Sequence, residues 1–512
     1  MNGFMKASCV CASPPLRIRV RVIGLEAGNA HFIDLPPPFG IVSEVAESLG
    51  VRAFVIGGYV RDFFLGRHSS DIDIVVEGSG IDLAQAVAKA VSEKTKRECP
   101  VAVFRNFGTA MLHYKGDEIE FVGARKESYN RNSRKPIVED GTLEDDQLRR
   151  DFTINAMAFS LQKEDFGALV DPFGGIKDLS AGIIRTPLDP QVTYSDDPLR
   201  MFRAVRFVCK LSTPQTRFRI VDESLQAMRL MKDRIGILSK ERISDELCKM
   251  MACRRPAEGF RILDSVGILE DILPQLTNLK GVETVDGKGH KDNFSHSLKV
   301  LDNLCEEEES LGREPDIWLR WAALLHDIGK PASKRFDARQ GWTFHGHEVI
   351  GERMIPKVFA SLKLPQNEKM KFVQKLVGLH HRPVALVDEE VTDSAVRRLL
   401  FDAGNDIDAL MLLCNADITS KNAAKVERLR RNFELVRQKM TEVEAKDEIR
   451  NFKNPITGEY VMQVYGIGPG SNIGVIKEYI KNAILDGVIP NTFEAADALM
   501  RKYAPSLGLT EA

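Results

Sequence analysis

The sequence predicts a multidomain protein in which a small α/β head with a mixed sheet precedes a series of all-α segments. Three observations support this fold class. At 512 residues the chain is too long for a single hydrophobic core, and roughly three or four domains are expected. Short strand-like and helix-like segments alternate from Phe39 to about Pro190. From Tyr194 onward the apolar pattern is almost entirely helical.

The head elements follow from this apolar pattern. Residues 41–50 are expected to form a helix, AFVIGG a strand, YVRDFFLG a helix and DIDIVV a second strand. A helix rich in alanine, Ile81 to Lys94, precedes the strand candidates VAVF, GTAMLHY and EIEFVGA. Residues 125–148 are polar and charged without a clear period, which predicts a loop able to move.

The helical part is divided by breaks in the pattern. Residues 281–289 (GVETVDGKG) are expected to form a linker, and GIGPGSNIG interrupts the last seventy residues before a final helix. No apolar run approaches the ~18 residues of a membrane span, so no membrane partner is expected. The eight cysteines are scattered, which favours a reducing, cytoplasmic location. A net charge of −2 means that nucleic acid would bind through local patches.

The segment Gly57 to Val76 carries the most informative pattern. Asp71 and Asp73 lie two apart on an apolar strand and so point to the same side, which suits a divalent cation such as Mg²⁺. Gly57 and Gly58 permit a tight turn close to a phosphate, and Arg61 adds a cation in the first turn of the following helix. The order of glycine turn, helix and Asp-x-Asp strand predicts nucleotidyl transfer.

Two further segments supply candidates for the same site. Glu120 could be a third metal-facing carboxylate, although Glu118 competes with it and either residue could simply face solvent. Arg150 would suit a triphosphate, and Asp151 and Asn155 could hydrogen-bond the ribose of a ribonucleotide. The alternative for Asp151 is a helix cap.

A basic stripe is expected on the helix that contains SDDPLRMFRAVRF. Arg200, Arg203 and Arg206 recur every three residues, opposite an apolar stripe that should pack inward. Asp197 with Arg200 offers an acceptor and a donor that match the shared edge of cytosine and adenine. The alternative is a solvated charged surface.

The second half of the chain contains a cluster of candidate metal ligands. His326 and Asp327 are adjacent at the end of an apolar helix, where two polar groups would need partners. Nitrogen and carboxylate ligands together suit Mn, Ni, Co, Zn or Fe better than Mg alone. The alternative is an RNA-binding module in which some histidines are merely buried.

The motifs GGYVRD, DIDI, RRDFTINA and DDPLRMFRAVRF resemble those of class II tRNA nucleotidyltransferases and bacterial poly(A) polymerases, over about residues 40 to 270. The resemblance implies that Gly58, Arg61 and Arg150 bind the nucleotide and that Asp197 and Arg200 select the base, with Arg203 and Arg206 after them. It implies Mg²⁺ on Asp71 and Asp73. Asp196 stands where the family usually has Glu.

The implied reaction is attack of an RNA 3′-OH on the α-phosphate of ATP or CTP, with release of pyrophosphate, and the expected RNA is tRNA. Full CCA addition, partial addition of CC or A, and poly(A) synthesis share these motifs.

The histidine half resembles the HD phosphohydrolase domain, with HDIGK as its most specific part. The implied ligands are His296, His326, Asp327 and Asp417, and His347 and His380 fit variants with a second metal. In an alternative of another class, this domain is the working phosphohydrolase, acting on nucleotide or RNA-end phosphates, and the head only grips tRNA.

The expected organisation has five parts. These are an N-terminal extension (1–38), a catalytic nucleotidyltransferase head (39–190), a helical neck that binds base and RNA (191–285), an HD domain (286–440) and a helical tail with a tRNA contact (441–512).

Overall fold

The computed structural model describes residues 22–23, 35–128, 137–285, 288–289, 292–388, 392–419, 423–447 and 453–512. The chain divides into two compact units, Met1–Leu238 and Ser239–Ala512. Most of the expected extension 1–38 lies outside the described residues, and the five-part division stays a prediction.

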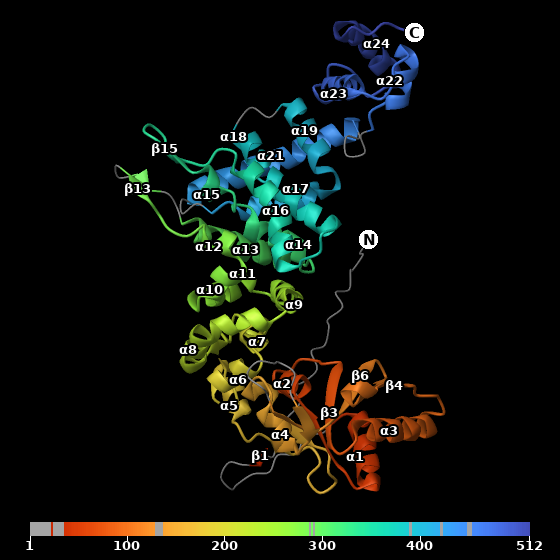
Figure 1. Ribbon diagram of the computed structural model, residues 1–512, viewed down its shortest axis with the longest axis vertical. Coiled ribbons are helices and arrows are strands. Elements are labelled where there is room, and N and C mark those ends of the chain that lie inside the picture. The colour runs from red at the N-terminus through yellow and green to blue at the C-terminus, as the bar shows by residue number, and fades with distance from the viewer. Residues whose placement is uncertain are drawn as a thin grey trace, which may run out of the picture. The chain divides into compact units, whose positions relative to one another are not determined.

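The first unit is built on an eight-stranded sheet with the order β1-β10-β9-β2-β3-β6-β5-β4 (Figure 1). The β3–β6 and β1–β10 pairs are parallel and the other pairs are antiparallel, so the predicted mixed sheet is confirmed. The strands are β1 Val22–Ile23, β2 Arg52–Ile56, β3 Asp71–Glu77, β4 Val101–Phe104, β5 Thr109–Tyr114, β6 Asp117–Gly123, β9 Ala158–Ser160 and β10 Leu169–Val170.

Helices cover the sheet because its central strands are apolar on both faces. Helices α1 (Pro37–Leu49) and α3 (Gly80–Thr95) pack on each other and on the sheet (Figure 1). Gly80 begins α3 directly against β6, since a Cβ there would lie 2.8 Å from the carbonyl oxygen of Phe121. Phe54 and Val75 pack in a second apolar cluster that includes helix α4 (Leu143–Leu148).

The expectation of a loop through residues 125–148 is wrong for the part that the structure describes. β7 (Arg125–Ser128) pairs with β8 (Ile137–Asp140), and α4 follows them. A capping box between Thr142 and Asp145 starts α4. Backbone pairing and helix capping need no apolar period, so the hydrophobic pattern did not predict this hairpin and this helix. Within the expected linker 281–289, β13 (Thr284–Val285) pairs with β14 (Lys288–Gly289).

The first unit ends in helices that carry the basic stripe. Helix α6 (Pro190–Asp196) precedes helix α7 (Leu199–Leu211), and α8 (Asp222–Met231) follows it. Helix α2 (Gly58–Phe64) lies earlier in the chain, between β2 and β3. The apolar side of α7 is buried and its three arginines are half-buried, as their spacing predicts.

The second unit is mainly helical. A buried ion pair joins three of its helices: Nε of Arg320 donates to Glu308 at 2.7 Å, and its Nη1 donates to the carbonyls of Met251 and Cys253. The principal helices are α9 Lys240–Met251, α10 Pro256–Ser265, α13 Asn293–Ser310, α14 Ile317–Leu325, α16 His347–Leu362, α17 Glu368–Leu379, α19 Asp393–Ala403, α20 Ile407–Ala416 and α21 Ala423–Asp447. The short strands β15 (Arg335–Asp337) and β16 (Gly341–Thr343) form a hairpin.

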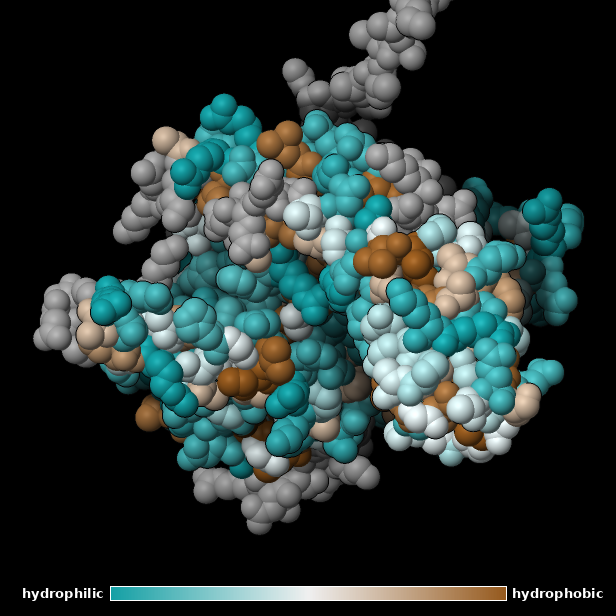
Figure 2. Space-filling model, turned by 90° about the horizontal axis from the view of Figure 1, so that it is seen from above, coloured by the Kyte–Doolittle hydropathy of each residue, from teal (hydrophilic) through white to brown (hydrophobic). Residues whose placement is uncertain are grey.

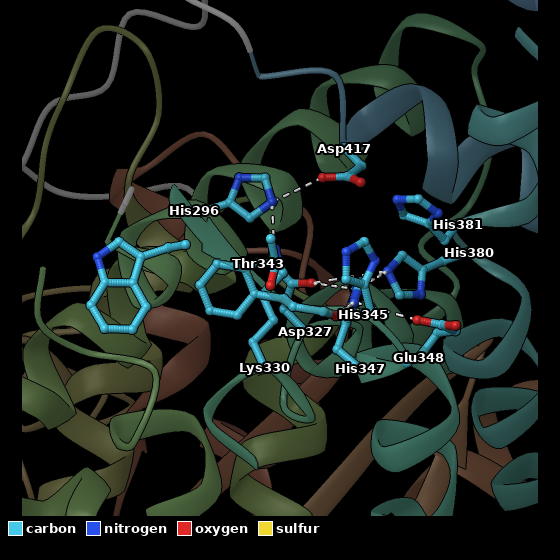
Figure 3. Close-up of a pocket in the computed structure, with 13 residues that line it drawn as sticks. His296, Asp327, Lys330, Thr343, His345, His347, Glu348, His380, His381 and Asp417 are labelled. Atoms are coloured by element: carbon cyan, nitrogen blue, oxygen red, sulfur yellow. Dashed lines mark hydrogen bonds and ion pairs between the residues drawn. The ribbon is translucent and has the colours of Figure 1, made fainter. Parts of the chain in front are cut away.

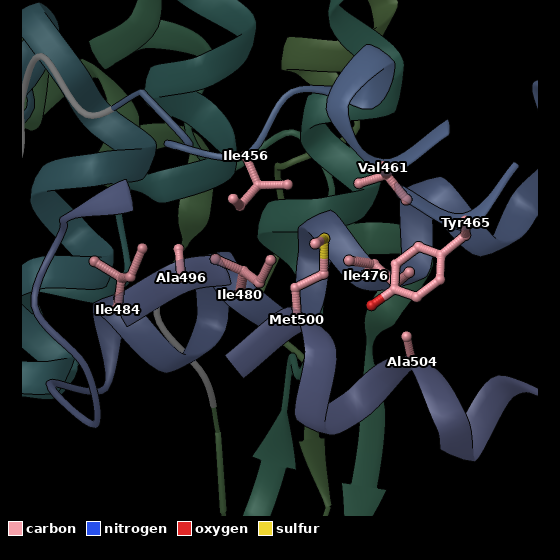
Figure 4. Packing of buried hydrophobic residues seen from close by; sticks show 9 residues of the cluster. All are labelled: Ile456, Val461, Tyr465, Ile476, Ile480, Ile484, Ala496, Met500 and Ala504. Carbon is pink, nitrogen blue, oxygen red and sulfur yellow. The ribbon is translucent and has the colours of Figure 1, made fainter. Parts of the chain in front are cut away.

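The last helices have a hydrophobic core of their own. α22 (Gly458–Tyr465), α23 (Ser471–Leu485) and α24 (Phe493–Tyr503) bury a cluster of nine residues (Figure 4). On the outside, both carboxylate oxygens of Asp486 accept from Arg398 of α19 at 2.9 Å.

No helix in the described ranges has the length and apolar character needed to cross a bilayer. On the face shown in Figure 2, hydrophobic residues form separate patches within a largely hydrophilic surface.

Candidate active sites

The first candidate site lies where β2 ends. Gly57 takes a φ of +85°, and a Cβ on it would lie 2.6 Å from Nη1 of Arg150 and 3.3 Å from Oδ2 of Asp73. Only glycine therefore leaves room for this guanidinium and this carboxylate at the turn. The β2–β3 pairing brings them there, because Asp73 lies opposite Ile56, next to Gly57 in the chain.

The carboxylates of this site come from neighbouring strands. The parallel β3–β6 register places Asp71 beside Glu118 and Asp73 beside Glu120. Burial raises the pKa of Asp73, and the charges of Asp71 and Glu120 add to the rise while Arg150 opposes it. Clustered carboxylates of this kind are stabilised by a divalent cation, so the residues present fit one.

The carboxylates are nevertheless not tightly gathered. Among the described residues, the close groups of three metal-ligating side chains all lie in the second unit, and Asp71, Asp73 and Glu120 form no such group. This agrees with the chemistry of Mg²⁺, which usually binds one or two carboxylates and takes its other ligands from water and substrate phosphates.

Arg61 is held inside the protein. It is 3% exposed, its Nη1 donates to Oδ1 of Asn155 at 2.7 Å, and its Nε donates to Asp62 at 2.9 Å. Its guanidinium lies 5.2 Å from the ring centre of Phe207. A phosphate would thus meet an arginine whose orientation is already set.

Asp151 and Asn155 lie in the same network rather than at an open mouth. Oδ1 of Asp151 accepts from the backbone N–H of Phe152 and from Nδ2 of Asn155, and its Oδ2 accepts from Nε of Arg203 at 2.7 Å. Burial raises the pKa of Asp151, but Arg203 and Asn155 outweigh it and hold the pKa below its usual range. The short helix at Thr153–Asn155 has no side-chain cap, so Asp151 does not cap it.

The residues expected to select the base have internal partners as well. Oδ1 of Asp197 accepts from the backbone N–H of Leu199 at 3.1 Å, and Nη2 of Arg200 donates to the carbonyl of Arg149. Arg206 lies with its guanidinium 4.8 Å from the ring centre of Phe207. These hydrogen bonds orient the side chains of Asp197 and Arg200.

Sequence reasoning missed Asp146, the buried acid of α4. Its side chain is 0% exposed and lies between Arg149 and Arg150. The spacing of three and four residues could have indicated these pairs. Because Asp146 lies in a run of acidic residues, however, the sequence gives no sign that its side chain is buried.

The second candidate site is the pocket of about 490 Å³ shown in Figure 3, in the second unit. Five helices supply its ligands. His296 lies on α13, His326 and Asp327 directly follow α14, His347 begins α16, His380 ends α17 and Asp417 ends α20. All six side chains predicted as HD ligands thus lie around one pocket or in contact with its lining.

Hydrogen bonds fix the tautomers of three of these histidines. The Nδ1 atoms of His326, His347 and His380 lie 2.7–2.8 Å from backbone carbonyls, which only accept, so each Nδ1 carries a proton. In a neutral ring, Nε2 is then a lone pair directed into the site. Burial acts to lower the pKa of His326, but the charge of Asp327 opposes this effect and raises the pKa. Burial lowers the pKa of His380 to about 3 and also lowers that of His347, which keeps both rings neutral.

These lone pairs face one another without a proton between them. Nε2 of His347 lies 3.2 Å from Nε2 of His380, a contact in which neither nitrogen can donate (Figure 3). Nε2 of His326 and Oδ1 of Asp327 are buried without a hydrogen-bond partner. Buried acceptors of this kind need a positive partner, so the donor set fits a metal cation.

The carboxylate of Asp327 divides the ligands into two groups. Its Oδ2 lies 3.5 Å from Nε2 of His296 and 3.3 Å from Nε2 of His326, whereas its Oδ1 lies 3.5 Å from Nε2 of His347 and 3.9 Å from Nε2 of His380. Asp417 completes the first group, with Oδ1 2.9 Å from Nε2 of His296. Close ligand sets are formed by His296, His326 and Asp417 and by His326, Asp327 and His380, so these side chains, with His347 beside them, would hold one or two divalent cations.

Three domain families match the chain. The poly A polymerase head domain matches residues 53–185, the probable RNA- and SrmB-binding site of polymerase A matches 217–280, and the HD domain matches 293–420. The head and HD domains imply dependence on a divalent metal.

Curated relatives cover most of the chain. An A-adding tRNA nucleotidyltransferase of Deinococcus radiodurans is 30% identical over 370 residues, which are 71% of this chain and 80% of the relative. A multifunctional CCA protein of Xylella fastidiosa is 32% identical over 378 residues, 72% of this chain and 83% of the relative. An A-adding tRNA nucleotidyltransferase of Aquifex aeolicus is 43% identical over 226 residues, but these are only 44% of this chain and 26% of that protein.

Solved structures share the fold. A Thermotoga maritima CCA-adding enzyme complexed with tRNA has a TM-score of 0.55 at 22% identity, covering 92% of this chain and 96% of that one. A tRNA-processing enzyme in an apo form has a TM-score of 0.53 at 25% identity, covering 78% of this chain and 99% of that one. Together with the head geometry and the two long alignments, these matches show that the chain belongs to the family of tRNA nucleotidyltransferases with a poly(A) polymerase head and an HD domain, and that it is a nucleotidyltransferase.

Proposed function

We propose that this enzyme adds CMP and AMP from CTP and ATP to the 3′ end of tRNA, releasing pyrophosphate. The observation that carries the proposal is the corner where Gly57, Asp73 and Arg150 meet. A backbone turn without a side chain, a carboxylate and a guanidinium at one point suit a metal-bound triphosphate. Relatives named for A addition and for CCA addition both support a tRNA substrate.

Each group at the corner has a part in this proposal. Asp71 and Asp73 would hold Mg²⁺, with Glu120 beside them on β6. When bound, Mg²⁺ supplies charge neutralisation for the triphosphate and for the leaving pyrophosphate. Arg150 contacts the phosphates at the Gly57 turn, and Gly58 lies next to it in the chain. Positioning and electrostatics carry the rate, and the protein forms no covalent intermediate.

The remaining predicted residues act around this corner. Arg61, whose guanidinium is fixed by Asp62 and Asn155, would attract the phosphates through its positive charge. Asp151 and Asn155, proposed from the sequence as ribose contacts, join Arg61 to Arg203 in one network. Asp197, which lies just before α7, and Arg200 in the first turn of α7, with Arg206 after them, would pair with the base.

The direct test uses tRNA that ends at the discriminator base, at C or at CC, with labelled CTP and ATP supplied separately. Full CCA addition requires incorporation of CTP on the first two ends and of ATP on the third. Incorporation of ATP alone on the CC end would instead indicate an A-adding enzyme, and long adenylate tails a poly(A) polymerase. The double variant Asp71→Ala, Asp73→Ala should abolish all incorporation while the HD pocket stays intact.

A second activity is favoured by the position of Asp327, whose two carboxylate oxygens face different histidines. We propose that the HD pocket, with two transition metals on His296, His326, Asp417, His347 and His380, hydrolyses phosphate esters of nucleotides or RNA ends. Lys330 lies 2.6 Å from Asp327 at the same pocket and could contact the phosphate.

The two activities are separable by substitution. Asp327→Ala should stop phosphate release and spare incorporation, whereas Asp71→Ala with Asp73→Ala should do the reverse. Loss of both activities from either change would contradict the two-site proposal.

The cysteines bear on location. We propose a cytoplasmic location because the six cysteines that lie in the described ranges form no disulfide, as a reducing compartment favours.

A further inference from the structure

Helix α4 presents a buried carboxylate that is fixed from several sides. Asp146 accepts from Nε of Arg149 at 2.9 Å on Oδ1 and from Nε of Arg150 at 3.0 Å on Oδ2. The capping box at Thr142 secures the start of the helix, and Nε2 of Gln147 donates to the carbonyl of Ala156 at 2.7 Å. Asp146 therefore has a defined place relative to the sheet.

The bond to Asp146 determines where the guanidinium of Arg150 lies. Because Nε is taken by Asp146, the outer nitrogens extend toward the Gly57 turn, where Nη1 occupies the space that a Cβ of Gly57 would need. The guanidinium makes a second hydrogen bond, from Nη1 to the carbonyl of Asn155, which is long at 3.4 Å. The charge-assisted bond to Asp146 is thus the strong one.

We infer that Asp146 is a positioning residue for nucleotidyl transfer, which holds Arg150 in place to meet the triphosphate at the Gly57 turn. The inference rests on the proposed function of that turn. An arginine that is already oriented loses little rotamer freedom when it binds a phosphate. The nucleotide is therefore bound more tightly and in the position that the reaction needs.

Charge alone predicts the opposite result. Asp146 is an anion near a site for an anionic ligand, and its removal would leave Arg149 and Arg150 as two uncompensated cations. If Asp146 acted only through its charge, Asp146→Asn would tighten ATP binding. If Asp146 positions Arg150, the same substitution weakens binding although the site becomes more positive.

The test compares Asp146→Asn, Arg150→Ala and the double variant in the full-length enzyme. We expect each single variant to raise the Kd for ATP with Mg²⁺ and the KM for incorporation by about 10- to 100-fold. The double variant should be no worse than Arg150→Ala, because residues that act through one another are not additive. Unchanged or tighter ATP binding by Asp146→Asn, or additive losses in the double variant, would overturn the inference.

Two matched variants separate positioning from folding. Asp145→Ala removes the carboxylate half of the capping box of the same helix and should lower Tm without changing the Kd for ATP. Arg149→Ala removes the other partner of Asp146 and should leave Kd within about threefold of the wild type, as for a partly exposed pair. If Asp146→Asn does not fold, the Kd of Arg149→Ala for ATP becomes the test. A loss of ATP affinity in Arg149→Ala as large as that in Arg150→Ala would overturn the inference.

The two readouts keep this inference distinct from the proposed function. Label incorporation by the wild-type enzyme tests nucleotidyl transfer to tRNA. ATP binding, measured by equilibrium dialysis, tests the link between Asp146 and Arg150 whether or not tRNA is extended.

Discussion

Replacing Gly57 with alanine tests whether the turn, the arginine and the carboxylate form one site. The substitution adds a single methyl group in a backbone conformation with φ of +85° and ψ of −130°. Alanine is strained there by about 1–3 kcal/mol, and this strain should lower stability. The larger effect is expected on activity, because the methyl group would occupy the place of the Arg150 guanidinium.

The magnitude follows from the distances at the turn. The added Cβ would lie 2.6 Å from Nη1 of Arg150, whereas ordinary contact begins at 3.4 Å, so the guanidinium must withdraw by about 0.8 Å. A displacement of about 1 Å can cost on the order of 10²-fold in rate. We therefore expect kcat/KM for nucleotide incorporation to fall by about 100-fold.

Gly66→Ala is the matched control. Gly66 also has a positive φ, of +65°, but nothing lies within 4 Å of its added Cβ. It should lower Tm with little change in kcat/KM. Incorporation of labelled nucleotide into tRNA is measured at a temperature where both variants are folded. If Gly57→Ala keeps a kcat/KM within about threefold of Gly66→Ala, the reasoning about the corner is refuted.

Three further predictions concern the second unit. Arg320→Met should lower the free energy of unfolding by about 3–5 kcal/mol in urea titrations, because it leaves Glu308 charged and buried, and adding Glu308→Gln should recover part of the loss. Metal analysis should find two ions in the wild type, one in His347→Ala and none in Asp327→Ala; equal metal content in all three would contradict the bridged site. In metal-stripped protein, burial lowers the pKa of His380 to about 3, whereas an unfolded histidine binds its proton near 6.5. The unfolded state then binds more protons between these values, so stability falls as pH drops below about 6.5, and His380→Gln should reduce that fall in thermal unfolding scans.

The apolar period predicted most of the head but not its polar parts. Strand β3 was expected because Ile72 and Ile74 alternate with the two aspartates, and the structure buries both isoleucines. The hairpin of β7 and β8 was missed, since its strands are held by backbone pairing and carry few apolar side chains. An apolar period in the sequence predicts which side chains are buried. It does not predict strands that are held together mainly by backbone hydrogen bonds.

The site residues were found by motif, but their partners were not. Arg61 and Asn155 lie 94 positions apart, so no spacing rule could show that they share a hydrogen bond. In the histidine pocket, residue types indicated a metal. The division of ligands between the two oxygens of Asp327 depends on how five helices pack, which no local pattern contains.

The separate core of the tail has a consequence for how the protein responds to its medium. Helices α22, α23 and α24 bury their apolar side chains among themselves. Arg398 of α19 contacts them through Asn482 and Asp486, and the side chains of Arg398 and Asp486 are each 41% exposed. Contacts between exposed charges weaken as dissolved ions accumulate, whereas a hydrophobic core does not. Concentrated salt should therefore loosen the attachment of the last sixty residues while leaving them folded, and any property that depends on that attachment varies with ionic strength.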